Sequence, residues 1–316
     1  MRPDPLAPLL AAGAVVIIDG GLGTQLEAQG ADLSDPLWSA RLLRDAPGGI
    51  VAAHLAYYRA GARLAITASY QATFAGYAAR GIARDDAANL MRRSVRLASA
   101  ARERHLAERA GGDVGPLFVG ASVGPYGAML ADGSEFRGRY GLTVEALRDF
   151  HRERMEVLAD AGPDLLVCET IPEVEEAAAL VDLVDDAGVP AWLVFSCADG
   201  ARLASGAPVE EAFALAEGSG AVVGVGVNCT LPVHLPELIA RAAAVSSKTI
   251  VVYPNSGERW DATARGWVPG PPGTGVDPPA ARRWVDAGAR IVGGCCRVTP
   301  SMIAELSTAD LARDRP

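Results

Sequence analysis

The most constraining feature of this sequence is a unit that recurs along the whole chain. Each unit starts with a short run rich in Val, Ile and Leu, continues through Gly or polar residues, and ends in a longer stretch with helical periodicity. Short continuous apolar runs are typical of strands that are buried on both faces, as in parallel sheets. We find eight such runs, at Val15–Asp19, Arg63–Ala68, Leu117–Ser122, Asp164–Glu169, Ala191–Ser196, Val222–Asn228, Thr249–Pro254 and Arg290–Gly294.

Helical stretches alternate with these runs. They cover Ile50–Ala60, Asp86–Ala110, Val144–Ala161, Val174–Ala187, Glu210–Glu217, Leu235–Ala244, Pro279–Ala287 and Ser301–Leu311. Several end in an Ala-Gly step, at Gly61, Gly162, Gly188 and Gly288, where glycine can adopt the left-handed conformation that ends a helix. Eight strand–helix units favour a closed barrel over an open sheet. We therefore expect residues 1–316 to form a single α/β domain, a TIM-type (β/α)8 barrel.

Composition argues against two classes of partner. The net charge of −9 disfavours nucleic acid, because binding to backbone phosphates needs clustered Lys and Arg. No apolar run reaches the ~18–20 residues that cross a bilayer, and the apolar N-terminus runs straight into the first strand. Five cysteines are an odd number for a disulfide framework. We expect a cytoplasmic protein in a reducing setting, with small-molecule ligands and neither nucleic-acid nor membrane partners.

The active site of such a barrel lies at the C-terminal ends of the strands. Cys229 ends the sixth expected strand, and Cys295 and Cys296 end the eighth, which is its near neighbour around a closed barrel. Three thiolates could therefore meet and bind Zn²⁺ with the fourth position open, as in catalytic zinc sites. The alternative is three buried thiols without a metal. Cys168 and Cys197 end other strands, and we interpret them as core residues.

Two carboxylates also follow expected strands. Asp19 opens the turn DGGLGT after the first strand, and Glu169 ends the fourth. Together they could hold an α-ammonium group through charge-assisted hydrogen bonds. The alternatives are that Asp19 caps the helix that follows and that Glu169 pairs with an arginine on the barrel rim. The glycine-rich turn matches neither the dinucleotide fingerprint nor the P-loop.

Seven motifs occur in a characteristic order: DGGLGT, ITASYQATF, VGASVGPYGAMLADGSEFRG, CET, GVNC, YPNSGE and GGCCR. With them the chain resembles the homocysteine S-methyltransferase family from about Asp19 to about Met302, and most closely its S-methylmethionine-dependent branch. The resemblance implies a zinc (β/α)8 barrel in which Cys229, Cys295 and Cys296 hold the metal. It also implies that Asp19 and Glu169 bind the amino group of homocysteine.

The resemblance extends to three further positions. Asn255, in YPNSGE, matches a residue that in some relatives can approach the zinc when substrate is absent. Ser122 and Val123, in GASVGP, lie where backbone amides could receive the substrate carboxylate. One departure is that the first turn reads GGLGT, whereas some relatives have Ala in place of glycines there, and we expect no change in the chemistry.

The expected reaction is transfer of a methyl group from a sulfonium donor to the thiol of L-homocysteine, which forms methionine. Zinc would keep the homocysteine sulfur as the nucleophilic thiolate. S-methylmethionine is the first candidate donor and S-adenosylmethionine the second. The alternatives are the same barrel with another donor, such as betaine or a folate, and a non-catalytic zinc- or amino-acid-binding barrel.

The donor's positive sulfur needs a site of its own, which aromatic faces or a carboxylate could supply. The aromatic candidates are Trp38, Tyr70, Phe74, Tyr126 and Phe136. The glycine-rich stretch Ala131–Gly141 suggests a lid over the site. The Pro/Gly-rich stretch Trp267–Pro279 is typical of a long loop.

Overall fold

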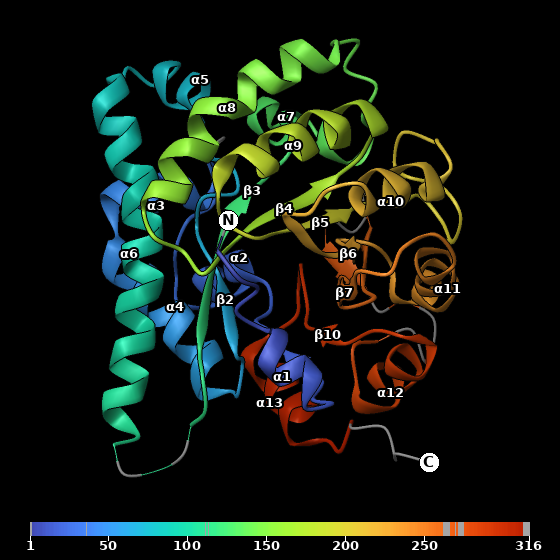
Figure 1. The fold of residues 1–316 in the computed structure, drawn as a ribbon. Coiled ribbons are helices and arrows are strands. Elements are labelled where there is room, and N and C mark those ends of the chain that lie inside the picture. The colour runs from blue at the N-terminus through green and yellow to red at the C-terminus, as the bar shows by residue number, and fades with distance from the viewer. Residues whose placement is uncertain are drawn as a thin grey trace.

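Eight parallel strands form one barrel in the computed structural model (Figure 1), which describes residues 2–35, 37–110, 112, 114–261, 266–268, 270 and 275–311. The strands lie in the order β1-β10-β7-β6-β5-β4-β3-β2. Backbone hydrogen bonds from Arg63 N to Ile17 O, 2.7 Å, and from Asp19 N to Leu64 O, 3.1 Å, join β1 to β2. The predicted (β/α)8 barrel is confirmed.

Every run that we interpreted as a buried strand contains one. The strands are β1 (Val16–Ile17), β2 (Leu64–Ile66), β3 (Phe118–Val123), β4 (Leu165–Ile171), β5 (Ala191–Phe195), β6 (Val222–Asn228), β7 (Thr249–Tyr253) and β10 (Ile291–Val292). Their side chains alternate between two cores. Val16 and Ile18 belong to one apolar cluster with Trp192 and Val251. Ile17, between them, belongs to the larger cluster that includes residues of the surrounding helices.

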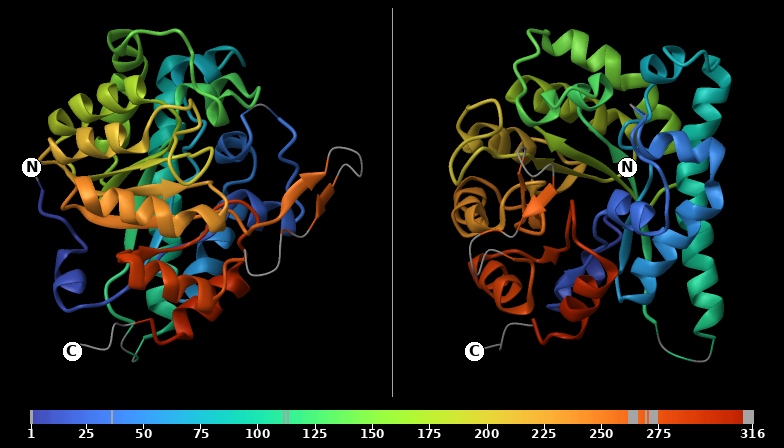
Figure 2. Two further views of the ribbon diagram at one scale, coloured as in Figure 1. Left: turned by 90° about the vertical axis from the view of Figure 1, so that its right-hand side faces the viewer. Right: turned by 180° about the vertical axis from the view of Figure 1, so that it is seen from behind.

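Helices surround the strands, as the two further views show (Figure 2). The expected helices are α4 (Pro47–Arg59), α6 (Arg84–Glu108), α8 (Val144–Asp160), α9 (Val174–Ala187), α10 (Val209–Glu217), α11 (Leu235–Val245), α12 (Pro278–Ala287) and α13 (Pro300–Thr308). Side chains cap two of them, because Thr143 accepts from Ala146 N at the start of α8 and Asp277 accepts from Ala280 N at the start of α12.

The glycines of the four Ala-Gly steps have positive φ angles. They are 98° at Gly61, 79° at Gly162, 67° at Gly188 and 133° at Gly288. Residues other than glycine adopt positive φ angles at a cost in free energy, so these glycines mark the ends of the helices in the sequence.

Several short elements were not predicted. They are α1 (Ala7–Ala11), α2 (Leu22–Ala28), α3 (Ser39–Asp45), α5 (Phe74–Ala78), α7 (Tyr126–Leu130) and the 3₁₀ turns η1 (Ser134–Phe136) and η2 (Pro232–His234). All are too short to show a helical period, and most lie in the loops that follow strands. Leu6, before α1, packs with the cluster of Val16 and Ile18, so the N-terminal segment is part of the fold.

The long loop predicted at Trp267–Pro279 is wrong at both ends. Trp267 and Val268 belong to β9 (Gly266–Val268), which pairs with β8 (Arg259–Asp261) in an antiparallel hairpin, and α12 begins at Pro278. Residues 269 and 271–274 lie outside the described part of the chain.

Among the residues that the structure describes, no helix is both long enough and apolar enough to span a membrane.

Candidate metal and substrate site

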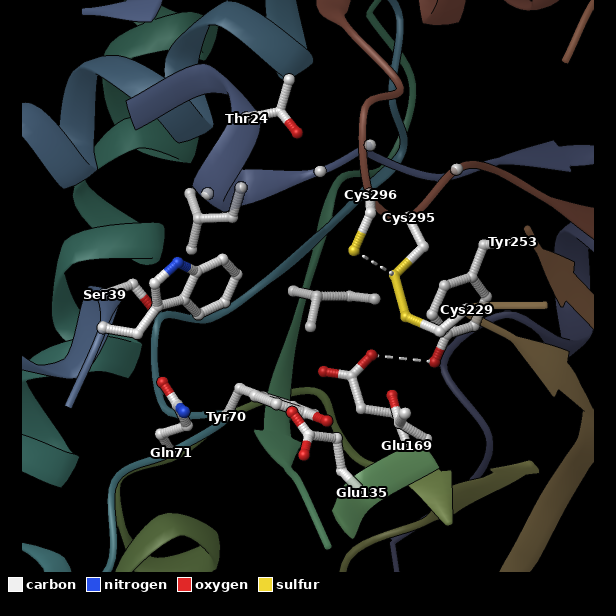
Figure 3. Close-up of a pocket in the computed structure, with 18 of the residues that line it drawn as sticks. Thr24, Ser39, Tyr70, Gln71, Glu135, Glu169, Cys229, Tyr253, Cys295 and Cys296 are labelled. Atoms are coloured by element: carbon white, nitrogen blue, oxygen red, sulfur yellow. Dashed lines mark hydrogen bonds between the residues drawn. A yellow bond between two sulfur atoms is a disulfide. The ribbon is translucent and has the colours of Figure 1, made fainter. Parts of the chain in front are cut away.

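The three cysteines predicted to bind metal lie together at the C-terminal ends of β6 and β10. Their sulfur atoms all fall within 4.8 Å of one another. Cys229 and Cys295, 66 positions apart, have Cα atoms 5.6 Å from each other and are joined here as a disulfide (Figure 3). The Cys296 sulfur lies 4.0 Å from that of Cys295. We predicted that these three cysteines meet, but we did not predict a disulfide between two of them.

Backbone hydrogen bonds fix the positions of these cysteines. Cys229 N donates to Tyr253 O at 3.3 Å, and Cys295 N donates to Pro254 O at 2.7 Å, so both are held to the end of β7, which lies between β6 and β10. Cys229 has a φ angle of 47°, a left-handed conformation that is rare for a side chain other than Gly, Asn or Asp. Such strain tends to persist at functional sites, where the surrounding structure enforces it.

The donor set fits a soft divalent metal ion. Three thiolate ligands at about 2.3 Å from Zn²⁺ in a tetrahedron lie about 3.8 Å from one another. The sulfurs of Cys295 and Cys296, 4.0 Å apart, already have about this spacing, whereas those of Cys229 and Cys295 would have to separate on reduction. Metal binding requires reduced and deprotonated sulfurs. Burial raises the pKa of Cys296 to about 11, so this thiol ionises at neutral pH only with a nearby positive charge. The cluster could therefore hold a metal ion after reduction of the disulfide.

Glu169 lies at the end of β4 and is buried. Ser122 Oγ donates to its Oε1, and the hydroxyl of Tyr253 donates to its Oε2 at 3.1 Å. Burial raises the pKa of Glu169 to about 7, although both hydrogen bonds lower it. No arginine pairs with Glu169 among the described residues, so the rim ion pair considered above is absent there.

Asp19 is also buried, at the end of β1. Its Oδ2 accepts from Ile66 N at 2.7 Å, while no described residue bonds to its buried Oδ1. Burial and then the charge of Glu169 raise the pKa of Asp19 well above its usual range. Helix α2 begins after Gly21 without a side-chain cap, so Asp19 does not cap it. The two carboxylates are near enough to influence each other, as a shared cation would require.

A cavity of about 450 Å³ lies above this end of the barrel. Cys229, Cys295, Cys296 and Glu169 line it, and Figure 3 shows them around one space. Among the described residues that line the cavity, the charged ones are Asp35, Glu135 and Glu169, and none is Lys, Arg or His. An acidic cavity with thiolate donors favours cationic ligands and metal ions.

The remaining predicted residues have different surroundings. Ser122 is buried in β3, where its amide already donates to Thr67 Oγ1 at 3.0 Å. Its amide is therefore engaged in the protein, and its hydroxyl supports Glu169. Val123 is equally buried, and neither residue lines the cavity. Asn255 also lies outside the lining, but its buried Oδ1 has no hydrogen-bond partner among the described residues.

Three of the five aromatic candidates line the cavity: Trp38, Tyr70 and Phe136. Trp38 and Tyr70 meet edge to face, with ring centroids 6.4 Å apart. Phe74 and Tyr126 are not among the lining residues. Cys168 and Cys197 lie outside the metal cluster, and burial raises the pKa of both thiols.

Sequence reasoning missed Tyr253, Thr170 and Glu135, which also line the cavity. Tyr253 ends the seventh apolar run and Thr170 follows Glu169, so position at a strand end was a usable signal for both. Glu135 lies in the loop between α7 and α8, where no strand periodicity marks it.

Comparison with known proteins places this geometry in a family. The sequence profile described as homocysteine S-methyltransferase matches residues 16–309. The chain belongs to the homocysteine S-methyltransferase family. It is 48% identical to homocysteine S-methyltransferase 4 of Zea mays, over 94% of this chain and 90% of that one. It is 45% identical to a selenocysteine Se-methyltransferase of Brassica oleracea var. italica, over 92% of this chain and 87% of the relative.

A solved structure in this family has the same fold. The homocysteine methyltransferase MmuM from Escherichia coli, in its metallated form, superposes with a TM-score of 0.86 at 44% identity. The match covers 96% of this chain and 99% of that one. The family predicted from the motifs is thus confirmed.

Proposed function

We propose that this chain, acting as a single barrel over residues 1–316, transfers a methyl group from a sulfonium donor to the thiol of L-homocysteine and forms methionine. The observation that carries the proposal is the cavity at the strand ends, which combines three converging cysteine sulfurs with carboxylates and no described basic residue. S-methylmethionine is the first candidate donor, followed by S-adenosylmethionine.

The metal proposed for Cys229, Cys295 and Cys296 is zinc. Three thiolates leave one position of a tetrahedral ion for a further ligand, and Zn²⁺ prefers soft sulfur donors. When bound, zinc supplies the Lewis acidity that keeps the homocysteine sulfur deprotonated at neutral pH. The orphan Oδ1 of Asn255 supports the proposal that this side chain approaches the metal when substrate is absent.

Glu169 and Asp19 are proposed to bind the α-ammonium group of homocysteine. Both carboxylates are buried without a described countercharge, so a bound cation would relieve the cost of their ionisation. Ser122 and Tyr253 hold Glu169 in place for this role. The proposal that the amides at Ser122 and Val123 receive the substrate carboxylate has weaker support, because the amide of Ser122 is engaged by Thr67.

The transfer itself needs no proton donor for the leaving group. The homocysteine sulfur forms a bond to the methyl carbon while the bond from that carbon to the donor sulfur breaks. The donor sulfur keeps the electron pair and leaves as a neutral thioether, and the proton of the homocysteine thiol passes to solvent. The protein must therefore align two sulfur atoms and exclude competing nucleophiles. Trp38 and Tyr70 offer aromatic surface for the donor.

The partners implied are small molecules, homocysteine and its methyl donor, without nucleic acid or a membrane. A cytoplasmic location is proposed because it would keep the three cysteines reduced. This proposal rests on the chemistry of the thiols.

A donor panel on reduced, zinc-loaded protein tests the proposal. S-methylmethionine, S-adenosylmethionine and betaine are each supplied with homocysteine, and methionine is measured. We expect turnover with a sulfonium donor, one zinc ion per chain, and loss of both in Cys229→Ser. The matched control Cys197→Ser should keep its zinc, because Cys197 lies outside the cluster.

Two results would favour the alternatives. Zinc binding without turnover for any donor would support a non-catalytic binding barrel. Turnover with betaine alone would retain the barrel and the acceptor but reject the sulfonium donor. Homocysteine methylation by a protein that holds no metal would overturn the role proposed for the cysteines.

A further inference from the structure

Glu135 places a carboxylate in the cavity that the homocysteine proposal does not use. It lies in η1, between α7 and α8, and lines the same cavity as the cysteines. Figure 3 shows its carboxylate beside the ring of Tyr70 and on the same side of the cavity as Glu169. Its Oε2 is buried without a hydrogen-bond partner among the described residues.

The other two acids of the cavity are satisfied by the protein. Asp35 pairs with Arg80 at 2.9 Å, and Glu169 accepts hydrogen bonds from Ser122 and Tyr253. Glu135 forms no ion pair within the described part of the chain, and the charged group that acts on it is another acid, Asp132. Burial, and to a smaller extent the charge of Asp132, raise the pKa of Glu135. Glu135 is only partly buried, but a carboxylate oxygen that is buried without a partner is costly unless a ligand supplies one.

The backbone around Glu135 is fixed without help from its carboxylate. Asp132 Oδ1 accepts from Ser134 N at 2.9 Å, and Ser134 itself is buried. Ser196 Oγ contacts Glu135 O at 3.4 Å. A Cβ atom on Gly127 would lie 2.5 Å from Glu135 N, so glycine permits this close packing. The segment Ala131–Gly141, predicted as a lid, is therefore tied to the barrel and presents Glu135 in a defined position.

The acids of the site suit different cations. Glu169, which lines the cavity, and Asp19, which is outside its lining, are hydrogen-bonding carboxylates suited to an ammonium group, which has N–H donors. Glu135 is instead accompanied by the aromatic rings of Tyr70, Trp38 and Phe136, which also line the cavity. A sulfonium ion has no N–H donor, and aromatic faces with a single carboxylate stabilise such a soft cation well.

We propose that Glu135 recognises the positive sulfur of the methyl donor and so makes the enzyme selective for cationic donors. This inference rests on the proposed function and assigns a donor subsite, at Glu135 and Tyr70, within the same cavity. Glu135 provides charge complementarity to the donor before transfer. The positive charge of the donor is lost when the sulfonium becomes a neutral thioether. Glu135 then no longer attracts the product, which favours its release.

Two unreactive donor analogues test this proposal by calorimetry on zinc-loaded protein. In one, a protonated dimethylamino group replaces the dimethylsulfonium of S-methylmethionine. In the other, an isopropyl group replaces it, so the shape is kept and the charge removed. Both retain the α-ammonium group. We expect wild-type protein to bind the cationic analogue about tenfold tighter or more, a difference of about 1.4 kcal/mol.

The decisive variant is Glu135→Gln, which keeps the size of the side chain. We expect the preference for the cationic analogue to fall to within about threefold, with homocysteine affinity and zinc content unchanged. Glu135→Asp should keep part of the preference, because it keeps the charge. The matched control is Glu27→Gln, which removes an exposed acid of α2 outside the cavity lining and should preserve the preference.

The outcomes separate this proposal from the one on which it rests. Equal weakening of both analogues by Glu135→Gln would show that Glu135 binds the α-ammonium group or only shapes the pocket, and would overturn the inference. An unchanged preference would overturn it as well. Failure of the wild type to methylate homocysteine would refute the proposed function, whereas the calorimetric ratio would still report on Glu135.

Discussion

Asn228 and Thr170 exchange two hydrogen bonds across the end of the barrel. Thr170 N donates to Asn228 Oδ1, and Asn228 Nδ2 donates to Thr170 Oγ1, both at 2.8 Å and both buried. Thr170 has a φ angle of 61°, and Cys229, which follows Asn228, has one of 47°. The pair therefore ties β4 to β6 and stabilises two left-handed residues, one beside Glu169 and the other a proposed metal ligand.

Asn228→Ala should weaken metal binding although Asn228 is not a ligand. Its loss leaves the amide of Thr170 buried without a partner, which costs about 1–3 kcal/mol in stability. It also releases the strained backbone of Cys229, so zinc affinity should fall. Chelator competition and thermal unfolding measure the two effects.

Thr170→Val is the graded comparison for Asn228→Ala. It removes the hydroxyl but keeps the amide that donates to Asn228, so its effect on zinc affinity should be smaller. Equal zinc affinity in Asn228→Ala and wild type would show that Cys229 keeps its position without this pair.

Gly293 is predicted to be intolerant of even one added carbon. A Cβ atom there would overlap the side chain of Ile18 and lie 2.8 Å from Asp19 O. Gly293→Ala should therefore cost about 1–3 kcal/mol through overpacking and reduce zinc affinity at Cys295, two residues along. Gly48, in α4, has nothing within 4 Å of its Cβ position, so Gly48→Ala should be neutral or stabilise by up to about 1 kcal/mol. Similar losses in both variants, measured by denaturant unfolding, would contradict this account of the glycine-rich motif.

The sequence predicted the barrel because burial on both faces makes each strand a continuous apolar run. The barrel in turn predicted that Cys229 and Cys295 lie close together, because the order of strands around a closed barrel brings distant strand ends together. Short elements such as α7 and η1 could not be predicted, because their conformation depends on contacts with the barrel and not on a period of their own. Glu135 was missed with them.

The hydrogen bonds of Glu169 were also beyond the sequence. The position of Glu169 at a strand end predicted that its carboxylate belongs to the site. Its two hydrogen-bond donors were not predicted, because we had assigned a backbone role to Ser122 and had interpreted Tyr253 as part of an apolar run. Which side chains of a barrel meet at one level depends on strand stagger, which the residue pattern does not reveal. The disulfide between Cys229 and Cys295 was not predicted either, because the residue pattern can bring two thiols together but does not reveal their oxidation state.

The raised pKa of Glu169 predicts pH-dependent binding of the amino acid. An α-ammonium group needs the ionised carboxylate, and the pKa of about 7 means that ionisation rises between pH 6 and 8. The affinity for L-norvaline, which has no thiol to titrate, should increase about tenfold over this range in zinc-loaded protein. Glu169→Gln should bind it weakly at every pH. A flat calorimetric profile for the wild type would show that Glu169 is already ionised at pH 6.

The same shift has the opposite effect on the free protein. Between the ordinary pKa of 4.5 and the folded value of about 7, the unfolded chain has lost the proton that folded Glu169 keeps. The free energy of unfolding of ligand-free protein should therefore fall as pH rises through this window, by on the order of 3 kcal/mol. The raised pKa of Asp19 changes the free energy of unfolding with pH in the same direction. Glu169→Gln should show a shallower slope in denaturant unfolding, and an unchanged slope would refute this assignment.

We predict that Arg154 supports the donor subsite indirectly, through the loop that carries Tyr70. Its guanidinium, completely buried in α8, donates to Gly124 O at 2.9 Å, Tyr70 O at 3.1 Å and Ser69 O at 3.3 Å. These carbonyls belong to the loops after β3 and β2, and a Cβ atom on Gly124 would overlap the Tyr70 ring. Burial lowers the pKa of Arg154 only to about 10, so it stays charged at neutral pH.

Arg154→Met removes this connection and leaves three carbonyls, two of them in buried hydrogen bonds, without this donor. We expect a loss of about 3–5 kcal/mol in stability, and a donor KM that rises several-fold more than that of homocysteine because Tyr70 loses its support. Arg154→Lys should recover part of the stability and little of the donor KM, since an ammonium group cannot span both loops. Arg152→Met, an exposed change on the same helix, should alter neither. Parallel increases in the two KM values for Arg154→Met would mean that Arg154 stabilises the barrel as a whole and has no particular role at the donor subsite.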